Sequence, residues 1–202
     1  MATHFWDERY RAAAGYVFGT APNDFLAAHA PAIPPGPVLC LAEGEGRNAV
    51  FLAQHGHAVT AVDQSAVGLA KARQLAAERG VPLTTIVADL AHFPIEPGAW
   101  AGIVAIFAHL PVPLRRIVNA QVVAGLRVGG VYLSEVYSPA QLAHGTGGPK
   151  DPALLVPLPA LRDELAGLDL MIAQEIERDV IEGAGHTGRA SVVQILAQRV
   201  RG

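Results

Sequence analysis

The sequence predicts an α/β sandwich built on a largely parallel sheet. Short apolar runs alternate with amphipathic segments five times between residues 38 and 137, which is the pattern of consecutive strand–helix units. Two longer runs follow at residues 169–181 and 189–200, with a polar, glycine-rich loop between them. Runs joined in this way are typical of an antiparallel pair, so we expect the sheet to close with a hairpin.

The composition narrows the class of protein. At 202 residues we expect one domain spanning residues 1–202, with residues 1–36 as a helical and aromatic cap segment. A net charge of −3 without a basic cluster argues against a nucleic-acid partner, and no apolar run reaches the ~20 residues of a membrane span. The single Cys40 and the polar N-terminus fit a cytoplasmic protein, and eight histidines without paired spacing predict no metal site.

The cap segment carries most of its aromatic residues early. Residues 4–13 are expected to form a short helix, and residues 15–23 an aromatic loop. Tyr16 and Phe18 are flanked by glycines in that loop. They could pack on the sheet, which is the usual role of such residues, or close over a bound ligand.

A glycine turn follows the first predicted strand. Residues 38–41 are apolar, residues 44–46 read Gly-Glu-Gly, and a helix opens at Arg47 and Asn48. The first glycine permits a positive φ, the second lets a ligand approach the bare main chain, and the helix N-terminus favours negative charge. The alternative is an ordinary strand–helix connection that requires two glycines.

An acidic residue ends the second predicted strand. Residues 57–62 are followed by Asp63, which lies 17 positions after Gly46 (63 − 46). A carboxylate at this point of a strand–helix–strand unit is placed to accept hydrogen bonds from ribose hydroxyls. The alternative role, capping the helix predicted over residues 65–79, is one that Ser65 can fill.

The third predicted strand, residues 83–88, is also followed by an acidic residue, Asp89. Asp89 could accept a hydrogen bond from an exocyclic adenine amine while Leu90 covers the ring. The alternative is that Asp89 caps the short segment that follows it.

The second half of the chain supplies the remaining elements. Strands are predicted at residues 101–107 and 131–137, a mobile polar lid at residues 144–151 and a helix at residues 159–166. The helix after Pro111 is expected to bury Leu114, Ile117, Val118 and Val122.

These polar residues should meet at one edge of the sheet. Ligands of parallel sheets bind outside the carboxyl ends of the strands. The glycine turn, Asp63, Asp89 and residues 107–109 all fall at such ends. Their agreement favours a nucleotide-like ligand more strongly than the glycines do alone.

At these residues the chain resembles the class I S-adenosylmethionine-dependent methyltransferases, and among them the small tellurite-resistance and thiopurine-type enzymes. Residues 44–49 give the Gly-Glu-Gly-Arg-Asn-Ala turn that those enzymes pair with an aromatic N-terminal segment. The resemblance implies a Rossmann-like, mostly parallel seven-stranded sheet with an antiparallel last strand, and S-adenosylmethionine as cofactor. The cofactor-binding residues that it implies are Glu43, Gly44, Glu45, Gly46, Arg47, Asn48, Asp63, Gln64, Asp89, Leu90, Ile106, Phe107 and His109.

The chain departs from the family pattern just before the turn. Cys40 stands where the family often has an acid, and Ala42-Glu43 where it has Gly-Cys. The resemblance therefore leaves two groups for the cofactor's ammonium, Glu43 or a backbone carbonyl.

The expected activity is methyl transfer to a small-molecule acceptor, with soft nucleophiles such as a thiol or a chalcogen oxyanion-derived species as one class. His109 is the first candidate for a base or an acceptor contact, with His186 next. Arg189 could steer an anionic acceptor. For each of these residues the alternative is a structural hydrogen bond.

Two other functions stay open at this point. An NAD(P)-dependent oxidoreductase also fits, because Gly44, Gly46 and Ala49 with Asp63 satisfy the dinucleotide fingerprint, although no second mononucleotide-binding half is evident. A non-catalytic S-adenosylmethionine-binding protein is the other possibility. The sequence does not indicate the acceptor or the oligomeric state.

Overall fold

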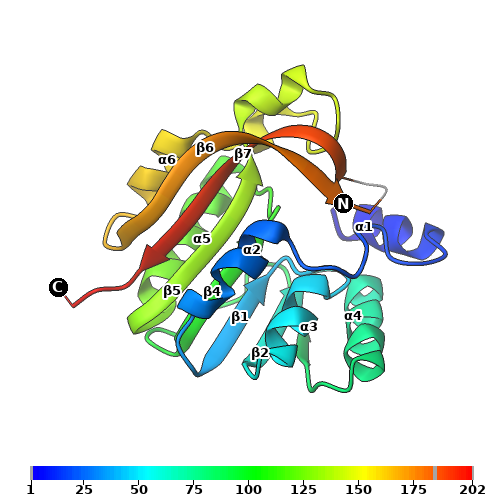
Figure 1. Ribbon diagram of the computed structural model, residues 1–202, viewed down its shortest axis with the longest axis horizontal. Helices are drawn as coiled ribbons and strands as arrows, with labels where there is room; N and C mark the ends of the chain where they lie inside the picture. Colours follow the sequence, from blue (N-terminus) through cyan, green and yellow to red (C-terminus); the bar gives the residue numbers. More distant parts are fainter. Residues whose placement is uncertain (1, 184–185, 202) are drawn as a thin grey trace.

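The computed structural model describes residues 2–183 and 186–201 and contains the expected sheet (Figure 1). Seven strands lie in the order β3-β2-β1-β4-β5-β7-β6. β1 to β5 are parallel, whereas β7 runs antiparallel to both of its neighbours. This topology confirms the predicted mostly parallel sandwich and its closing hairpin.

The strands are β1 (Pro37–Leu41), β2 (Ala58–Asp63), β3 (Thr84–Val87), β4 (Trp100–Ile106), β5 (Leu126–Tyr137), β6 (Asp169–Glu182) and β7 (His186–Gln198). The helices are α1 (Ala2–Ala12), α2 (Asp24–His29), α3 (Arg47–Gln54), α4 (Ala66–Glu78), α5 (Val112–Gly125) and α6 (Leu158–Glu164). No helix in the described part of the chain is long and apolar enough to cross a membrane.

Two apolar layers sandwich the sheet because successive strand residues point to opposite faces. In β1, Val38 and Cys40 pack with residues of α2, α3 and α4. Leu39 and Leu41 pack with residues of α5 and α6 on the other face. Because both faces are covered, β1 is almost continuously apolar, as expected of a central parallel strand.

Helix α5 is the main departure from the expected burial. Ile117, predicted to lie inward, is 54% exposed. The helix buries Val118 and Val122, but the same face carries the polar residues Arg115 and Asn119. Arg115 donates to Glu164 on α6 at 2.8 Å, so an ion pair occupies part of the face that the apolar pattern assigned to Ile117.

The boundaries of β5 also differ from the prediction. The strand starts at Leu126, five positions before the predicted residue 131 (131 − 126). Leu126 pairs with Trp100, and a register shift follows before Gly102 pairs with Val131. A β-bulge of this kind extends pairing through residues that read as a glycine-rich turn.

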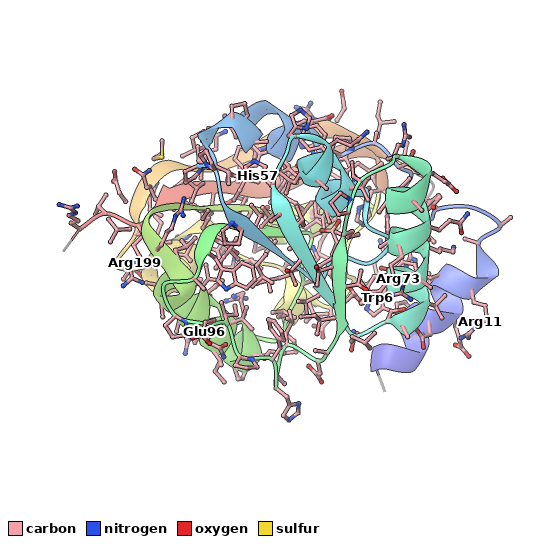
Figure 2. All side chains as sticks on the ribbon, turned by 90° about the horizontal axis from the view of Figure 1, so that it is seen from below. Trp6, Arg11, His57, Arg73, Glu96 and Arg199 are labelled. Carbon is pink, nitrogen blue, oxygen red and sulfur yellow. The ribbon has the colours of Figure 1, made fainter. Side chains whose placement is uncertain are left out.

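The cap segment docks on α4 (Figures 1 and 2). Lys71 of α4 donates its ammonium to the carbonyls of Tyr10 and Gly15, each at 2.6 Å. It also pairs with Glu45 of the glycine turn at 2.9 Å. One cation therefore fixes the end of α1 and the following loop against the glycine turn.

A buried polar network ties the cap segment to the hairpin. Asn23 caps α2 and donates its amide to Glu135 of β5 and Glu182 of β6, both at 2.8 Å. Arg178 donates to Glu135 at 2.5 Å, and Arg47 of α3 donates to Glu182 at 2.6 Å. Both buried carboxylates are thus paired with cations, as buried charges must be.

We expect Asn23→Ala to lower the free energy of unfolding by about 2–4 kcal/mol, because it leaves two buried carboxylates with one donor fewer and removes a helix cap. Urea unfolding measures this change. The exposed pair of Gln74 and Glu78 provides a matched control, and Gln74→Ala should shift stability by less than about 0.5 kcal/mol. Equal stability of the two variants would show that the network does not hold the cap segment.

Candidate functional site

Two strained residues mark the carboxyl edge of the sheet. Ala42 (φ 50°) and Phe107 (φ 53°) are the non-glycine residues with positive φ in the described chain. They directly follow β1 and β4, which are neighbouring strands. Backbone strain of this kind persists only where the surroundings enforce it, and it clusters at functional sites.

Asp63 holds the glycine turn in place. One carboxylate oxygen accepts from the Gly44 amide at 2.8 Å, and the other accepts from the Ser65 amide at 2.7 Å. Burial raises the pKa of this carboxyl, whereas these backbone hydrogen bonds lower it. Each oxygen keeps acceptor capacity for a further donor. The predicted helix cap is Ser65, whose hydroxyl accepts from the Gly68 amide.

Glu43 caps helix α3 from within the turn. Its Oε1 accepts from the amides of Asn48 and Ala49 at 3.0 and 2.8 Å. Burial raises the pKa of Glu43 to about 7 and also raises the pKa of the adjacent Cys40 thiol. The helix N-terminus that was expected to attract a ligand's negative charge therefore already has a carboxylate from its own turn.

The other polar side chains of the turn contact the cap segment and the hairpin. The Glu45 side chain accepts from the backbone N–H of Val17 at 2.8 Å, and the Asn48 side chain accepts from the backbone N–H of Asn23 at 2.9 Å. Arg47 is bound to Glu182. Because their side chains are engaged in these contacts, Glu45, Arg47 and Asn48 can offer a ligand only their main-chain atoms.

Tyr10 covers the turn. A Cβ added to Gly44 (φ +62°) would lie 2.5 Å from the Tyr10 hydroxyl, and one added to Gly68 would lie 2.9 Å from its ring. Tyr10 is 5% exposed and stacks on Trp6 at 5.5 Å. Sequence reasoning missed this residue, although the aromatic content of the N-terminal segment was a signal for it.

Asp89 and Leu90 lie past the end of β3, where the sequence places them. Asp89 is exposed, and its Oδ1 accepts from the Ala91 amide at 2.9 Å. Its capping role is therefore present, and its second oxygen remains available. Leu90 is buried and packs in the core layer below α5. Gln64 stands between Asp63 and Ser65.

His109 follows β4 with one ring nitrogen bound and the other free. Its Nδ1 lies 3.0 Å from the Leu154 carbonyl. Since a carbonyl can only accept, Nδ1 carries the proton and Nε2 presents a lone pair. Nε2 is buried without a hydrogen-bond partner, and burial lowers the pKa of the ring to about 4.

His109 belongs to a cluster of aromatic rings at the ends of β4 and β5, which we call the ring nest. Tyr137 stacks on Phe107 at 4.6 Å and on His109 at 5.5 Å. His186 contacts Phe107 at 4.7 Å and Tyr137 at 5.4 Å in edge-to-face geometry. Phe18 of the cap segment lies over His186 at 4.5 Å. The ring nest comprises Phe18, Phe107, His109, Tyr137 and His186.

The ring nest has two neighbours, Arg189 on β7 and the predicted lid at residues 144–151. The Arg189 guanidinium is half exposed and faces Glu177 of β6 at 3.3 Å. Thr146, within the predicted lid, donates its hydroxyl to the Arg189 carbonyl at 2.5 Å. Gly148 approaches the ring of Tyr137 so closely that a Cβ would lie 2.6 Å away. The loop therefore packs on the strand ends, and Arg189 steering an acceptor stays a prediction.

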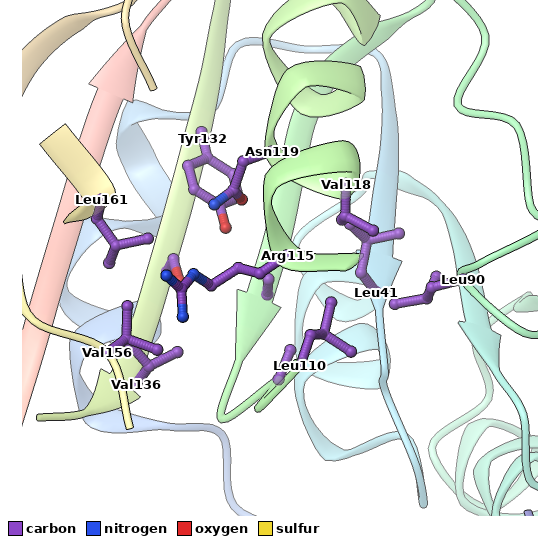
Figure 3. A pocket seen from close by; sticks show the side chains of 13 residues that line it. Leu41, Leu90, Leu110, Arg115, Val118, Asn119, Tyr132, Val136, Val156 and Leu161 are labelled. Atoms are coloured by element: carbon purple, nitrogen blue, oxygen red, sulfur yellow. The ribbon is translucent and has the colours of Figure 1, made fainter. Parts of the chain in front are cut away.

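A small cavity lies beneath the site, between the sheet and α5 (Figure 3). Its volume of about 20 Å³ has room for one water molecule and no more. Arg115 points into it, and its Nη1 is buried without a partner. The cavity is too small for a cofactor or an acceptor. The described residues contain no cluster of three or more metal-ligating side chains.

The depressed pKa of His109 predicts how stability depends on pH. An unfolded histidine titrates near pH 6.5, whereas folded His109 titrates at about 4. Between these values only the unfolded chain gains a proton at this ring, so stability is complete above pH 6.5 and declines as the pH falls toward 4.

Replacement of this ring tests the effect. Chemical unfolding at several pH values should show that His109→Gln removes about 1–3 kcal/mol of the wild-type loss between pH 6.5 and 4. Parallel curves for the two proteins would contradict the buried, neutral imidazole.

Comparison with known proteins agrees with this geometry. Residues 38–130 match the family model described as a methyltransferase domain. Over 117 residues, 56% of this chain and 52% of the relative, the chain is 31% identical to 2-heptyl-1-hydroxyquinolin-4(1H)-one methyltransferase of Mycobacteroides abscessus. The chain thus spans about half the length of this curated relative.

Solved structures share the whole fold. The chain superposes with a TM-score of 0.81 on a structure described as "Conversion of a Disulfide Bond into a Thioacetal Group during Echinomycin Biosynthesis", at 21% identity over 99% of this chain and 92% of that one. For TehB from Haemophilus influenzae the TM-score is 0.68, at 17% identity over 98% of this chain and 66% of that one.

An S-adenosylmethionine-dependent methyltransferase from Clostridium acetobutylicum gives a TM-score of 0.66, at 15% identity over 98% and 97% of the two chains. Sheet order, glycine turn and family match agree. Residues 38–130 are therefore similar to a methyltransferase domain, and the chain as a whole shares its Rossmann-like fold with these solved structures.

Proposed function

We propose that this protein transfers a methyl group from S-adenosylmethionine to a small-molecule acceptor. The observation that carries the proposal is the juxtaposition of two features on neighbouring strands. β1 ends in the glycine turn held by Asp63, and β4 ends at Phe107 and His109, where a free imidazole nitrogen is buried. A donor site beside an oriented base is what methylation of a protonated acceptor requires.

The residues at the glycine turn fit the methyl donor. Gly44 carries no side chain, and the Tyr10 ring that covers it would have to move aside for a donor to reach the main chain. Asp63 would take the ribose hydroxyls, and Asp89 with Leu90 would take the adenine. Glu43, which accepts from two helix amides and lies beside the Cys40 thiol, would take the ammonium group. When bound, S-adenosylmethionine supplies an electrophilic methyl group on a sulfonium centre.

His109 would then receive the acceptor's proton. The Leu154 carbonyl fixes the Nδ1–H tautomer, so the Nε2 lone pair faces the buried ring nest. Because burial lowers the pKa to about 4, the ring is neutral at physiological pH, and its Nε2 lone pair is available to accept a hydrogen bond from the acceptor's hydroxyl. The surrounding rings exclude water from this transfer.

We propose an acceptor that reacts through sulfur, another chalcogen or oxygen. A thiolate is a soft nucleophile and arrives already ionised, whereas a hydroxyl needs the base. Two relatives support this range of atoms. The curated relative is named for a hydroxylated quinolinone, and the echinomycin-related structure concerns the conversion of a disulfide.

Two alternatives are less well supported. A nicotinamide-dependent oxidoreductase requires a second mononucleotide-binding half, and here the sheet continues into the antiparallel β7 and β6 instead. A protein that only binds the donor has no need of a free base at His109.

Asp63→Asn should weaken S-adenosylmethionine binding about 10- to 100-fold, because the amide removes the charge that strengthens the hydrogen bonds to ribose. Isothermal titration calorimetry measures this, with thermal unfolding to confirm that the turn stays folded. Asp169→Asn at the start of β6 is a matched control that should bind as wild type. Binding of NADH and not of S-adenosylmethionine by the wild type would overturn the proposal.

His109→Gln should lower kcat about 10²- to 10⁴-fold for hydroxyl acceptors and leave donor affinity unchanged. For acceptors that arrive as thiolates the loss should be less than about tenfold, since no proton has to be removed. A labelled-methyl assay over thiols, tellurite or selenite, thiopurines and hydroxylated aromatics makes this comparison. Undiminished turnover of hydroxyl acceptors would remove His109 from the reaction.

A further inference from the structure

We propose that a cavity between the cap segment, α3 and the end of α4 is a second ligand site, and that it takes a small organic anion with an apolar body and one carboxylate group. None of the residues that line this cavity belongs to the ring nest, and neither Gly44, Asp63 nor Asp89 lines it. Neither the site nor its ligand class depends on the proposed methyl transfer.

Three segments that are far apart in the sequence enclose the cavity. One side comes from residues 20–22 of the loop between α1 and α2, another from α3 and a third from the C-terminal end of α4. The blue loop passes close to α3 in Figure 1. The cavity has a volume of about 210 Å³. Since a cavity of about 150 Å³ can hold benzene, this one has room for a ring with a short polar substituent.

The loop side of the cavity is held in place by hydrogen bonds to α3. The backbone N–H of Asn23 donates to the Asn48 side chain at 2.9 Å, and Arg47 donates to the Ala21 carbonyl at 3.4 Å. A ligand therefore does not have to order the loop when it binds. Preorganisation of this kind lowers the cost of binding.

The cavity is positively charged, although the chain as a whole carries a net charge of −3. Arg47 and Arg79 both line it, whereas no aspartate or glutamate of the described chain does. The charge of Arg47 is already balanced, because it pairs with Glu182 at 2.6 Å. The Arg79 side chain has no ion pair or hydrogen bond within residues 2–183 and 186–201. One uncompensated cation favours a ligand with a single negative charge.

Two further polar side chains line the cavity with free donors. The Thr20 hydroxyl and the Gln54 amide make no hydrogen bond in the described part of the chain. The guanidinium fork of Arg79 adds a third donor group, and it matches the two oxygens of a carboxylate. Because all three side chains can donate, the complementary ligand group is one that only accepts, as an ionised carboxylate does.

The remaining lining is largely apolar and favours an organic anion over an inorganic one. Val50 and Phe51 lie between Arg47 and Gln54 at helical spacing, so these residues form one stripe along α3. Phe51 packs against the core, and its ring lies 4.2 Å from the ring of His55. An inorganic anion would leave this apolar stripe uncovered, whereas an apolar body attached to the carboxylate would bury it.

Phenylacetate is the probe that tests the site, because it joins one ring to one carboxylate. Phenylacetamide has a similar shape without the charge, 2-phenylethylamine has the opposite charge, and inorganic phosphate has negative charge without a ring. NMR titrations of the wild type should show saturable phenylacetate shifts at the amides of Thr20, Phe51 and Gln54. Its affinity should exceed that of the other three compounds by at least about tenfold. The shifts should persist when S-adenosylhomocysteine is present at saturation.

Variants at exposed positions separate charge from shape. Arg79→Gln should weaken phenylacetate binding by at least about tenfold and leave phenylacetamide binding unchanged. Gln54→Glu places a like charge in the cavity and should weaken phenylacetate by a similar factor. Arg73→Gln also removes an exposed cation from α4, but Arg73 does not line the cavity, so this matched control should bind as wild type. Thermal unfolding shows whether each variant is folded.

The outcomes distinguish this site from the donor site. Phenylacetamide or phosphate binding as tightly as phenylacetate, or a folded Arg79→Gln variant with wild-type affinity, would overturn a site for organic anions. Shifts that disappear when S-adenosylhomocysteine is added would place phenylacetate in the donor site and overturn a second site. Failure of the wild type to bind S-adenosylhomocysteine would instead overturn the proposed methyl transfer, and phenylacetate shifts at the cavity would still support the second site.

Discussion

The site depends on two buried carboxylates, Glu135 and Glu182, that lie away from the glycine turn. Through Asn23, Arg47 and Arg178 they join the cap segment, the helix after the glycine turn and the closing hairpin. Each of these segments contributes to the edge where a ligand would bind. Because a buried carboxylate without partners is costly, the pairing constrains all three segments to one arrangement. The network is thus a means of positioning, whereas the chemistry lies with other residues.

Positioning by this network accounts for the contacts that several polar side chains of the turn make within the protein. Arg47, Asn48 and Glu45 were expected to bind the cofactor, and their side chains contact Glu182, Asn23 and Lys71. Asp63 behaves differently, because its two oxygens hold the turn and still have capacity for a ligand. The turn can therefore be rigid before a donor binds, which reduces the ordering cost of binding.

Much of the fold could be predicted from the sequence because local patterns decide it. The apolar run of β1, the amphipathic helix α4 and the hairpin strands each have a period that matches one kind of element. Ile117 and the start of β5 were misjudged because tertiary contacts decide them: the buried Arg115–Glu164 pair in one case and a β-bulge in the other. Periodicity of apolar residues carries no information about a buried ion pair.

The candidate site was predictable in part for the same reason. In parallel sheets, glycines and acidic residues that follow a strand lie at its carboxyl end. Gly44, Asp63 and Asp89 could therefore be assigned to that edge of the sheet from the sequence. Tyr10 and Tyr137 could not, since nothing local to them indicates that the cap segment and the end of β5 meet the turn and the rings.

The most direct test of the account follows the main-chain and histidine signals of the protein by NMR as S-adenosylhomocysteine is added. The account predicts saturable shifts at the amides of Gly44 and Gly46, together with a neutral His109 in its Nδ1–H tautomer near pH 7. Absence of shifts at the glycine turn, or a His109 ring protonated on Nε2, would contradict a donor site beside an oriented base.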